Sequence, residues 1–242
     1  MNESQGYLDL IVHDIGNLVN PLLYYLGSAQ SDTVLDSNTH DRLRKATAVT
    51  SATKNLVDSV RKLSEVKSSE FSARERHDLR EVLVRCISNA RRDFPSKDIV
   101  VSVDCPESET LTLADDLIDD LFTNVFNNAV KYTPGPVAEI EVGVQDAHTA
   151  WTVKIADHGI GIPDEKKGQV FTRFAKRPQG VDGTGLGLSI VALLANRYNG
   201  IVNVRDRVPG EPGAGACFEI SLPKAPPDES RLHNGEAVPG TY

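Results

Sequence analysis

Residues 124–134 read Asn-Val-Phe-Asn-Asn-Ala-Val-Lys-Tyr-Thr-Pro, and this stretch decides the fold of the chain. Asn124, Asn128 and Lys131 recur at intervals of four and three residues, which places them on one face of an α-helix. Apolar residues of this stretch and of the seven residues before it fall on another side and can pack: Leu117, Leu121, Val125 and Ala129. Because the proline that ends the stretch disfavours a helical residue before it, we predict a helix over about 115–132.

The face that carries the two asparagines suits a magnesium ion beside phosphate. An amide oxygen is a hard ligand of the kind that Mg²⁺ prefers, and a lysine nearby can neutralise phosphate charge. On its own this pattern indicates little, since asparagine and lysine on a helix usually form a solvated face. The residues that follow give it meaning.

Two glycine-rich stretches come after the helix, at residues 157–161 (Asp-His-Gly-Ile-Gly) and 183–187 (Gly-Thr-Gly-Leu-Gly). The first follows a predicted strand, so the carboxylate of Asp157 can accept the exocyclic amine of adenine. The second opens a predicted helix, where backbone N–H groups can approach an anion. A Gly-Lys-Ser/Thr phosphate loop is absent, and so is the strand–helix order of a dinucleotide-binding unit. Either stretch alone could be an ordinary turn.

In this order and spacing, the motifs resemble the ATP-binding fold shared by gyrase, Hsp90, histidine kinases and MutL, called GHKL or Bergerat. The residues within these motifs are most similar to those of the histidine kinase branch. Its asparagine motif resembles residues 124–134, its first glycine motif 157–161, its phenylalanine motif Phe171-Thr-Arg-Phe174, and its second glycine motif 183–187. The resemblance covers about residues 78–222.

The resemblance implies binding of ATP and Mg²⁺ and assigns a role to each matching residue. Asn128 would coordinate Mg²⁺, Asn124 would support the phosphates and Lys131 would contact phosphate. Tyr132 would flank the adenine, and Asp157 would bind it. The remaining cofactor-binding positions shape the nucleotide lid and its hinges: Gly159, Gly161, Arg173, Gly183, Thr184, Gly185, Leu186 and Gly187.

The expected lid lies between the two glycine motifs and is short and polar. Its cations are Lys166, Lys167, Arg173, Lys176 and Arg177. A charged lid suits closure over a triphosphate, with Arg173 reaching the γ-phosphate. His158 stands at a variable position of its motif and is expected on the lid surface.

The N-terminal part predicts a helical hairpin. A first helix over about 4–28 has apolar residues at spacings of three and four: Leu8, Ile11, Ile15, Leu18 and Leu22. A polar loop at 30–38 precedes a second helix over about 39–67 with a coiled-coil stripe: Leu43, Ala46, Val49, Thr53, Leu56, Val60, Leu63 and Val66. One hairpin cannot bury both stripes, so we expect a homodimer with a four-helix bundle.

His13 lies roughly opposite the first stripe, where a neighbouring domain could phosphorylate it. A neutral imidazole is nucleophilic, and Asp14 could accept or orient its proton. The segment resembles the phosphoacceptor motif of histidine kinases, and Asn17 matches the position that orients water for dephosphorylation of the partner. That family commonly has proline next, whereas this chain has Leu18, with Pro21 three residues later, so we expect any kink one turn further on.

The rest of the chain predicts an α+β sandwich with helices on one sheet face. Asp78 can cap a helix that runs to about Arg92. Strands are expected at 99–103, 111–113, 138–145, 150–156, 201–206 and 215–221, with a further helix at 187–199. We therefore expect a dimerisation and phosphotransfer hairpin at 1–70, a catalytic domain at 71–222 and a disordered tail at 223–242.

The composition excludes several classes of partner. The 242-residue chain has a net charge of −8, which disfavours nucleic acid and anionic membrane. No apolar run approaches the ~18 residues needed to span a bilayer, and no signal peptide begins the chain. The three cysteines are expected to be buried thiols in a reducing compartment. We expect a cytoplasmic location, although an upstream sensor could be membrane-bound.

Together these features predict a sensor histidine kinase core that autophosphorylates on His13 and passes the phosphoryl group to the receiver domain of a response regulator. One alternative is a non-catalytic module that uses the hairpin to dimerise and bind a partner. The intact Asn128, Lys131, Asp157 and glycines argue against it. The other is a serine kinase or ATPase of the same fold.

Overall fold

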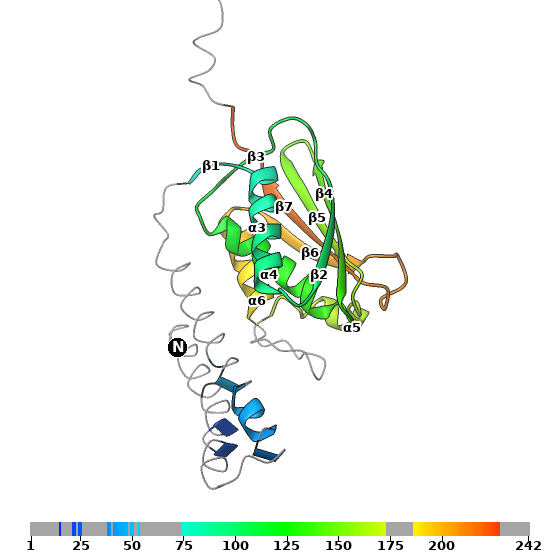
Figure 1. The fold of residues 1–242 in the computed structure, drawn as a ribbon. Helices are drawn as coiled ribbons and strands as arrows, with labels where there is room; N and C mark the ends of the chain where they lie inside the picture. Colours follow the sequence, from blue (N-terminus) through cyan, green and yellow to red (C-terminus); the bar gives the residue numbers. More distant parts are fainter. Residues whose placement is uncertain are drawn as a thin grey trace, which may run out of the picture.

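The computed structural model describes residues 74–172 and 186–227, together with scattered N-terminal positions at 15, 21, 22, 24, 25, 38, 39, 41–47, 49, 50 and 53 (Figure 1). All of these N-terminal positions are helical. On the second predicted stripe Ala46 is buried, whereas Leu43 is 38% exposed. The predicted 30–38 loop includes Asn38, which is helical. The hairpin as a unit and the four-helix bundle lie outside the described residues.

A five-stranded sheet forms one layer, with the order β2-β4-β5-β7-β6. Its strands are β2 (Asp98–Asp104), β4 (Val137–Asp146), β5 (Ala150–Asp157), β6 (Ile201–Asp206) and β7 (Ala216–Pro223). The β2–β4 pair is parallel and the other pairs are antiparallel. A separate antiparallel pair joins β1 (Glu75–Asp78) to β3 (Leu111–Ala114). The predicted strands are thus confirmed, whereas β1 has no counterpart in the sequence prediction.

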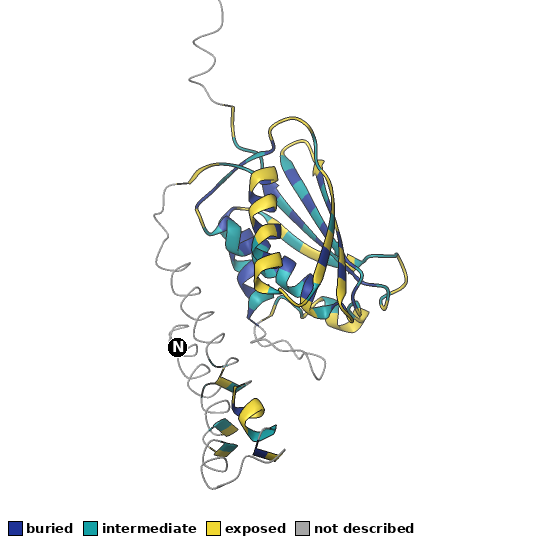
Figure 2. Ribbon diagram, viewed as in Figure 1, coloured by how far each residue is buried: buried dark blue, intermediate teal, exposed yellow. Residues whose placement is uncertain are grey.

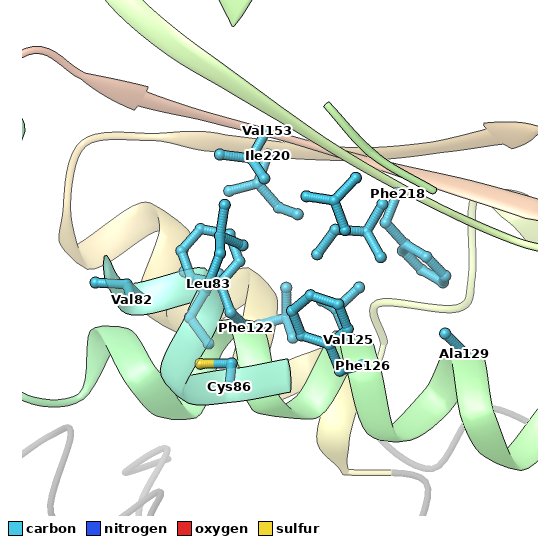
Figure 3. Close-up of a cluster of buried hydrophobic side chains, with 14 of the residues drawn as sticks. Val82, Leu83, Cys86, Phe122, Val125, Phe126, Ala129, Val153, Phe218 and Ile220 are labelled. Carbon is cyan, nitrogen blue, oxygen red and sulfur yellow. The ribbon is translucent and has the colours of Figure 1, made fainter. Parts of the chain in front are cut away.

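Helices α3 (Leu79–Asp93), α4 (Ile118–Tyr132) and α6 (Gly187–Arg197) cover one face of the sheet (Figure 1). The short α5 (Asp164–Lys167) lies near one end of the strands. Along β5, buried and half-buried residues alternate, because successive side chains point to opposite faces. Phe122 and Phe126 of α4 pack below Val153 and Ile220 of the sheet (Figure 3). The predicted α+β sandwich is confirmed (Figure 2).

The ends of α3 and α4 follow from a few polar contacts. Asp78 caps α3 as predicted, because its Oδ1 accepts the N–H of Arg80 at 3.0 Å. Helix α4 begins at Ile118 rather than near residue 115, because Asp115 forms a turn that accepts the N–H of Leu117 on its side chain. The predicted end at Tyr132 is confirmed, and Lys97 Nζ donates to the Val130 carbonyl at 2.8 Å.

The order of the domain extends past the predicted boundary at 222. Strand β7 ends at Pro223, and Lys224 forms a bridge with Thr112 of β3. The N–H of Ala225 donates to the Leu111 carbonyl at 2.8 Å. The start of the expected tail is therefore paired to β3, and its remainder at 228–242 lies outside the described residues.

A buried ionic cluster joins the start of α4 to the end of α6. Asp115 accepts hydrogen bonds from Arg197 at 2.6 Å and from the Tyr198 hydroxyl at 2.5 Å. Burial alone would raise the pKa of Asp115, but the bonds from Tyr198 and Arg197 bring it below its ordinary value. The cluster fixes α6 antiparallel to α4, so that the first residue of α6 lies beside the middle of α4.

Two expectations about the chain as a whole can be compared with the structure. Within the described residues, no helix is long and apolar enough to cross a membrane.

The three cysteines are free: Cys86 is buried, while Cys105 and Cys217 are half-buried. Burial raises the pKa of Cys86 and of Cys217 to about 11, which leaves both thiols protonated near neutral pH.

Candidate functional site

Asn124 and Asn128 of α4 face the first residue of α6. A Cβ atom added to Gly187 would lie 2.9 Å from Asn124 Oδ1 and 3.9 Å from Asn128 Nδ2. Asn124 also donates from Nδ2 to the Asp120 carbonyl at 2.7 Å, which fixes its amide. Glycine thus allows the backbone at the start of α6 to contact both amides, and the predicted asparagine and glycine motifs meet here.

The start of α6 is suited to an anion. The residue before it, Leu186, is buried, and among the described residues no side chain caps the helix. Ser189 donates its hydroxyl to the Leu186 carbonyl at 2.8 Å. The first N–H groups of a helix lack intrahelical partners and carry its positive dipole end. A phosphate group could satisfy them.

Asp157 ends β5 and is 3% exposed. Its Oδ1 accepts the N–H of Gly159 at 2.9 Å and the N–H of Ala216 at 3.2 Å. Burial raises the pKa of Asp157, and these two hydrogen bonds oppose that rise. Among the described residues, none donates to Oδ2, so one carboxylate oxygen is fixed and the other can accept an N–H of a ligand.

The loop after Asp157 is held closely from two sides. A Cβ atom at Gly159 would lie 2.7 Å from the carbonyl oxygen of Tyr132, which also accepts the N–H of Ile160 at 3.1 Å. Gly161 has a φ of +66°, and a Cβ atom there would lie 1.8 Å from the Pro212 carbonyl oxygen. The structure therefore brings Tyr132, Asp157, Gly159 and Gly161 together, as the motifs predict.

The opposing loop contributes residues that the sequence analysis missed. Gly215 has a φ of +104°, and a Cβ atom there would lie 1.9 Å from the Asp157 carbonyl oxygen. The prediction placed Gly215 inside a strand, whereas β7 begins at Ala216. A signal was present in the glycines at 210, 213 and 215, whose spacing indicates a turn that approaches another backbone.

Two further polar residues of α4, Lys131 and Asn127, are placed differently from Asn124 and Asn128. The ammonium of Lys131 lies 6.0 Å from the ring centroid of Phe94, at the end of α3. The Oδ1 of Asn127 is buried without a hydrogen-bond donor in the part of the chain that the structure describes. The close neighbours of the α6 start are thus Asn124 and Asn128.

The expectation for His158 was wrong. Its side chain lies on the outer face of the sheet, where Nε2 is 2.7 Å from Glu141 Oε1. The reason is the alternation of a strand: because Asp157 points to the helix-covered side, the next residue points to the opposite side. His158 therefore contacts β4 rather than forming part of a lid.

Several predicted site residues lie outside the described part of the chain: His13, Asp14, Asn17, Arg173, Gly183, Thr184 and Gly185. Of the phenylalanine motif, Phe171 is described and packs edge-on against Phe218 at a centroid distance of 6.3 Å. The described half of the site accordingly comprises the asparagine motif, the first glycine motif and the last two residues of the second.

The donor set fits a magnesium–nucleotide complex. The amides of Asn124 and Asn128 offer oxygen ligands, which Mg²⁺ prefers, directly beside the uncapped start of α6. Asp157 offers a buried acceptor beside the last turn of α4, where a base could bind. Glycines at 159 and 187 leave the space that side chains would fill.

Comparisons with known proteins agree with this geometry. Residues 114–226 match the family described as histidine kinase-, DNA gyrase B- and HSP90-like ATPase. The adaptive-response sensory kinase SasA of Rippkaea orientalis is 35% identical over 153 residues, which cover 61% of this chain and 38% of that protein. The chain spans less than half the length of each of five curated relatives that it matches, among them SasA.

Two solved structures are similar in fold. The mycobacterial sensor histidine kinase MprB is 28% identical, with a TM-score of 0.54 over 64% of this chain and 99% of that chain. Histidine kinase ThkA, solved in complex with the response regulator protein TrrA, has a TM-score of 0.70 over 93% of this chain and 62% of that chain. Its identity of 18% indicates a shared fold alone.

Proposed function

We propose that the chain is a sensor histidine kinase core, because residues 114–226 match the family described as histidine kinase-, DNA gyrase B- and HSP90-like ATPase. It transfers the γ-phosphoryl group of ATP to His13. The single observation that carries the proposal is the contact of Asn124 and Asn128 with the uncapped start of α6 at Gly187. This contact makes a phosphate site from residues far apart in sequence.

Asp157 selects and orients the base. Its fixed Oδ1 keeps the carboxylate in one position, and Oδ2 accepts the exocyclic N–H of adenine. The carbonyl of Tyr132 already holds the N–H of Ile160, so the last turn of α4 and the loop after β5 form one rigid wall. Tyr132 then lies beside the base.

Asn124 and Asn128 hold the phosphate end. Asn128 would coordinate Mg²⁺ through its amide oxygen, and Asn124 would support the phosphates together with the N–H groups of the first turn of α6. The ion, when bound, neutralises the charge that builds up on the phosphate oxygens. The contribution of these residues is positioning and charge complementarity rather than covalent chemistry.

The imidazole of His13 is the proposed nucleophile. A ring nitrogen forms a bond to the γ-phosphorus as the bond to the β-phosphate oxygen breaks, and ADP leaves. Asp14 accepts or orients the proton on the other ring nitrogen, while Lys131 and Arg173 contact phosphate and lid residues 183–186 close the site. Support comes from the acceptor motif and from the helical state of Ile15, two residues after His13.

The phosphoryl group then passes to an aspartate of a response-regulator receiver domain. ThkA, which shares the fold, was solved with such a protein. We further propose that two hairpins pair into a homodimer, and that Asn17 orients water when the phosphorylated regulator is hydrolysed. A cytoplasmic location follows from this partner class.

Incubation with γ-labelled ATP and Mg²⁺ tests the proposal. We expect an acid-labile, alkali-stable label on the chain that disappears in His13→Gln, with His40→Gln as the matched control. A wild-type chain that binds ATP but takes up no label would favour the non-catalytic module. An acid-stable label that persists in His13→Gln would favour a serine kinase of the same fold.

A further inference from the structure

We propose that His158 positions Asp157 for adenine by anchoring the outer side of the loop to β4, and so helps to set the base preference of the site. The inference rests on the nucleotide site proposed above and assigns a role to a residue outside the pocket. His158 does not touch the base. It acts through the peptide that joins it to Asp157.

Residue 158 makes three contacts with β4. Its Nε2 lies 2.7 Å from Glu141 Oε1, and because a carboxylate oxygen only accepts, the ring donates this hydrogen bond. Its backbone N–H donates to the Glu139 carbonyl at 3.3 Å, and its Nδ1 lies 3.6 Å from Glu139 Oε2. Since side chains 157 and 158 point to opposite faces of the sheet, fixing one of them fixes the direction of the other.

Glu141 also reaches the second chain segment that holds Asp157. Its Oε1 lies 3.8 Å from a guanidinium nitrogen of Arg207. Arg207 donates from Nε to the Ala214 carbonyl at 2.8 Å, and its N–H donates to the Gly215 carbonyl at 3.1 Å. The next residue, Ala216, supplies the N–H that binds Asp157 Oδ1. Glu141 thus joins the two segments that flank the carboxylate.

The position of this carboxylate decides which purine fits. An exocyclic amine donates to a carboxylate oxygen, whereas the carbonyl of hypoxanthine at the same place would face it with a second acceptor. The difference in affinity between the two bases is largest when the carboxylate is held in one position. Because the ion pairs around His158 are partly exposed, each is worth about fivefold in binding at most.

Titration of the full chain with Mg-ATP and with Mg-ITP tests the inference. Wild type should prefer ATP. We expect His158→Ala to weaken ATP binding about three- to fivefold without weakening ITP binding, so that the preference falls by the same factor. Glu141→Gln should act in the same direction, and the double variant should lose little more. His158→Lys retains a donor to Glu141 and should recover most of the preference.

Arg205→Gln is the matched control, because it breaks another exposed pair on the same sheet face, that of Arg205 with Glu219 at 2.9 Å. Its preference should equal that of wild type. Should His158→Ala not fold, His158→Gln takes its place. An unchanged ATP-to-ITP preference, or an equal loss for both nucleotides, would overturn the role of His158. A wild type that binds neither nucleotide, or an Asp157→Asn variant that binds ATP normally, would instead refute the proposed nucleotide site.

Discussion

Asp157 holds a carboxylate in a place where an ionised group opposes folding. Burial raises the pKa of Asp157 in the folded protein above that of an ordinary aspartate. Protonation of this carboxyl therefore stabilises the fold fully at a pH below the ordinary pKa, and this contribution is lost as the pH rises through the pKa of the folded state. Near neutral pH the ionised carboxylate of Asp157 therefore lowers the stability of the fold. We infer that this carboxylate serves ligand binding rather than folding.

The first prediction concerns Asp157→Asn. We expect ATP binding to weaken at least about tenfold, because the acceptor for the adenine amine is replaced. Asn can still accept the N–H groups of Gly159 and Ala216, so the melting temperature at pH 7 should stay equal or rise. Calorimetric titration and thermal melting measure the two effects.

Asp146→Asn is the control of opposite sign. The pKa of Asp146 is lowered by its hydrogen bond from Lys224, so its ionised form supports the fold. This variant should lose a little stability at neutral pH and keep full ATP binding. A loss of stability in Asp157→Asn as large as its loss of binding would contradict the account of a carboxylate retained for its ligand.

The second prediction compares two glycines with positive φ. Gly135, at +79°, has nothing within 4 Å of an added Cβ atom, whereas Gly161, at +66°, would place that atom 1.8 Å from the Pro212 carbonyl oxygen. Gly135→Ala should therefore cost about 1 kcal/mol, the backbone term alone. Gly161→Ala should cost about 3 kcal/mol or more, because it adds overpacking. Equal losses of unfolding free energy for the two variants, measured by urea denaturation, would contradict a close contact between the loop at Gly161 and the loop at Pro212.

At the scale of elements, the cluster of Asp115, Arg197 and Tyr198 holds α6 against α4. The third prediction is that Asp115→Asn destabilises the domain by about 2 kcal/mol at pH 7, because it removes the negative charge that pairs with Arg197 in a buried place. The hydrogen bonds from Tyr198 and Arg197 lower the pKa of Asp115 in the folded protein. The ionised carboxylate therefore stabilises the fold fully at a pH above its pKa in the unfolded chain, and this contribution disappears as the pH falls through its pKa in the folded protein.

The pH series supplies the test of that prediction. The difference in stability between wild type and Asp115→Asn should be largest above about pH 4 and should narrow as the pH falls further. A difference that stays constant from pH 7 to pH 2 would show that the ionised carboxylate is not what stabilises the contact between α4 and α6.

The elements that the sequence predicts best are those with local causes. Asp78 caps α3, Pro134 ends α4, and period-two alternation marks β4 and β5. The start of α4 was placed three residues too early, because the side chain of Asp115 competes for a backbone N–H in a way that periodicity does not reveal. Strand β1 is short and depends on pairing with β3 across the chain, so no local pattern indicates it.

The candidate site divides in the same way. Motif spacing is enough to assemble Asn124, Asn128, Asp157 and Gly159, because each lies at a fixed place on a helix or at a strand end. Gly215 escapes such reasoning, since its role comes from contact with Asp157, 58 residues earlier (215 − 157). His158 was misplaced because the motif suggests a lid, whereas strand alternation sends the side chain to the outer face.

At the scale of the whole molecule, the fourth prediction separates binding from phosphorylation. Residues 74–172 and 186–227 form one hydrophobic core of their own, so residues 71–242 should fold and bind Mg-ATP without the hairpin. This fragment should be monomeric in sedimentation and should take up no label, whereas the full chain should sediment as a dimer. A fragment that binds no nucleotide although it is folded would show that the hairpin completes the pocket.

Calorimetric titration of the full chain with ATP, in the presence and absence of Mg²⁺, tests the central claim most directly. We expect one site per chain, with tighter binding when Mg²⁺ is present, because the amide of Asn128 then gains its ligand. Asn128→Ala should lose this increment while keeping its melting temperature, and Asn127→Ala should retain the increment. Wild type that binds no ATP, or Asn128→Ala with an undiminished response to Mg²⁺, would contradict the account.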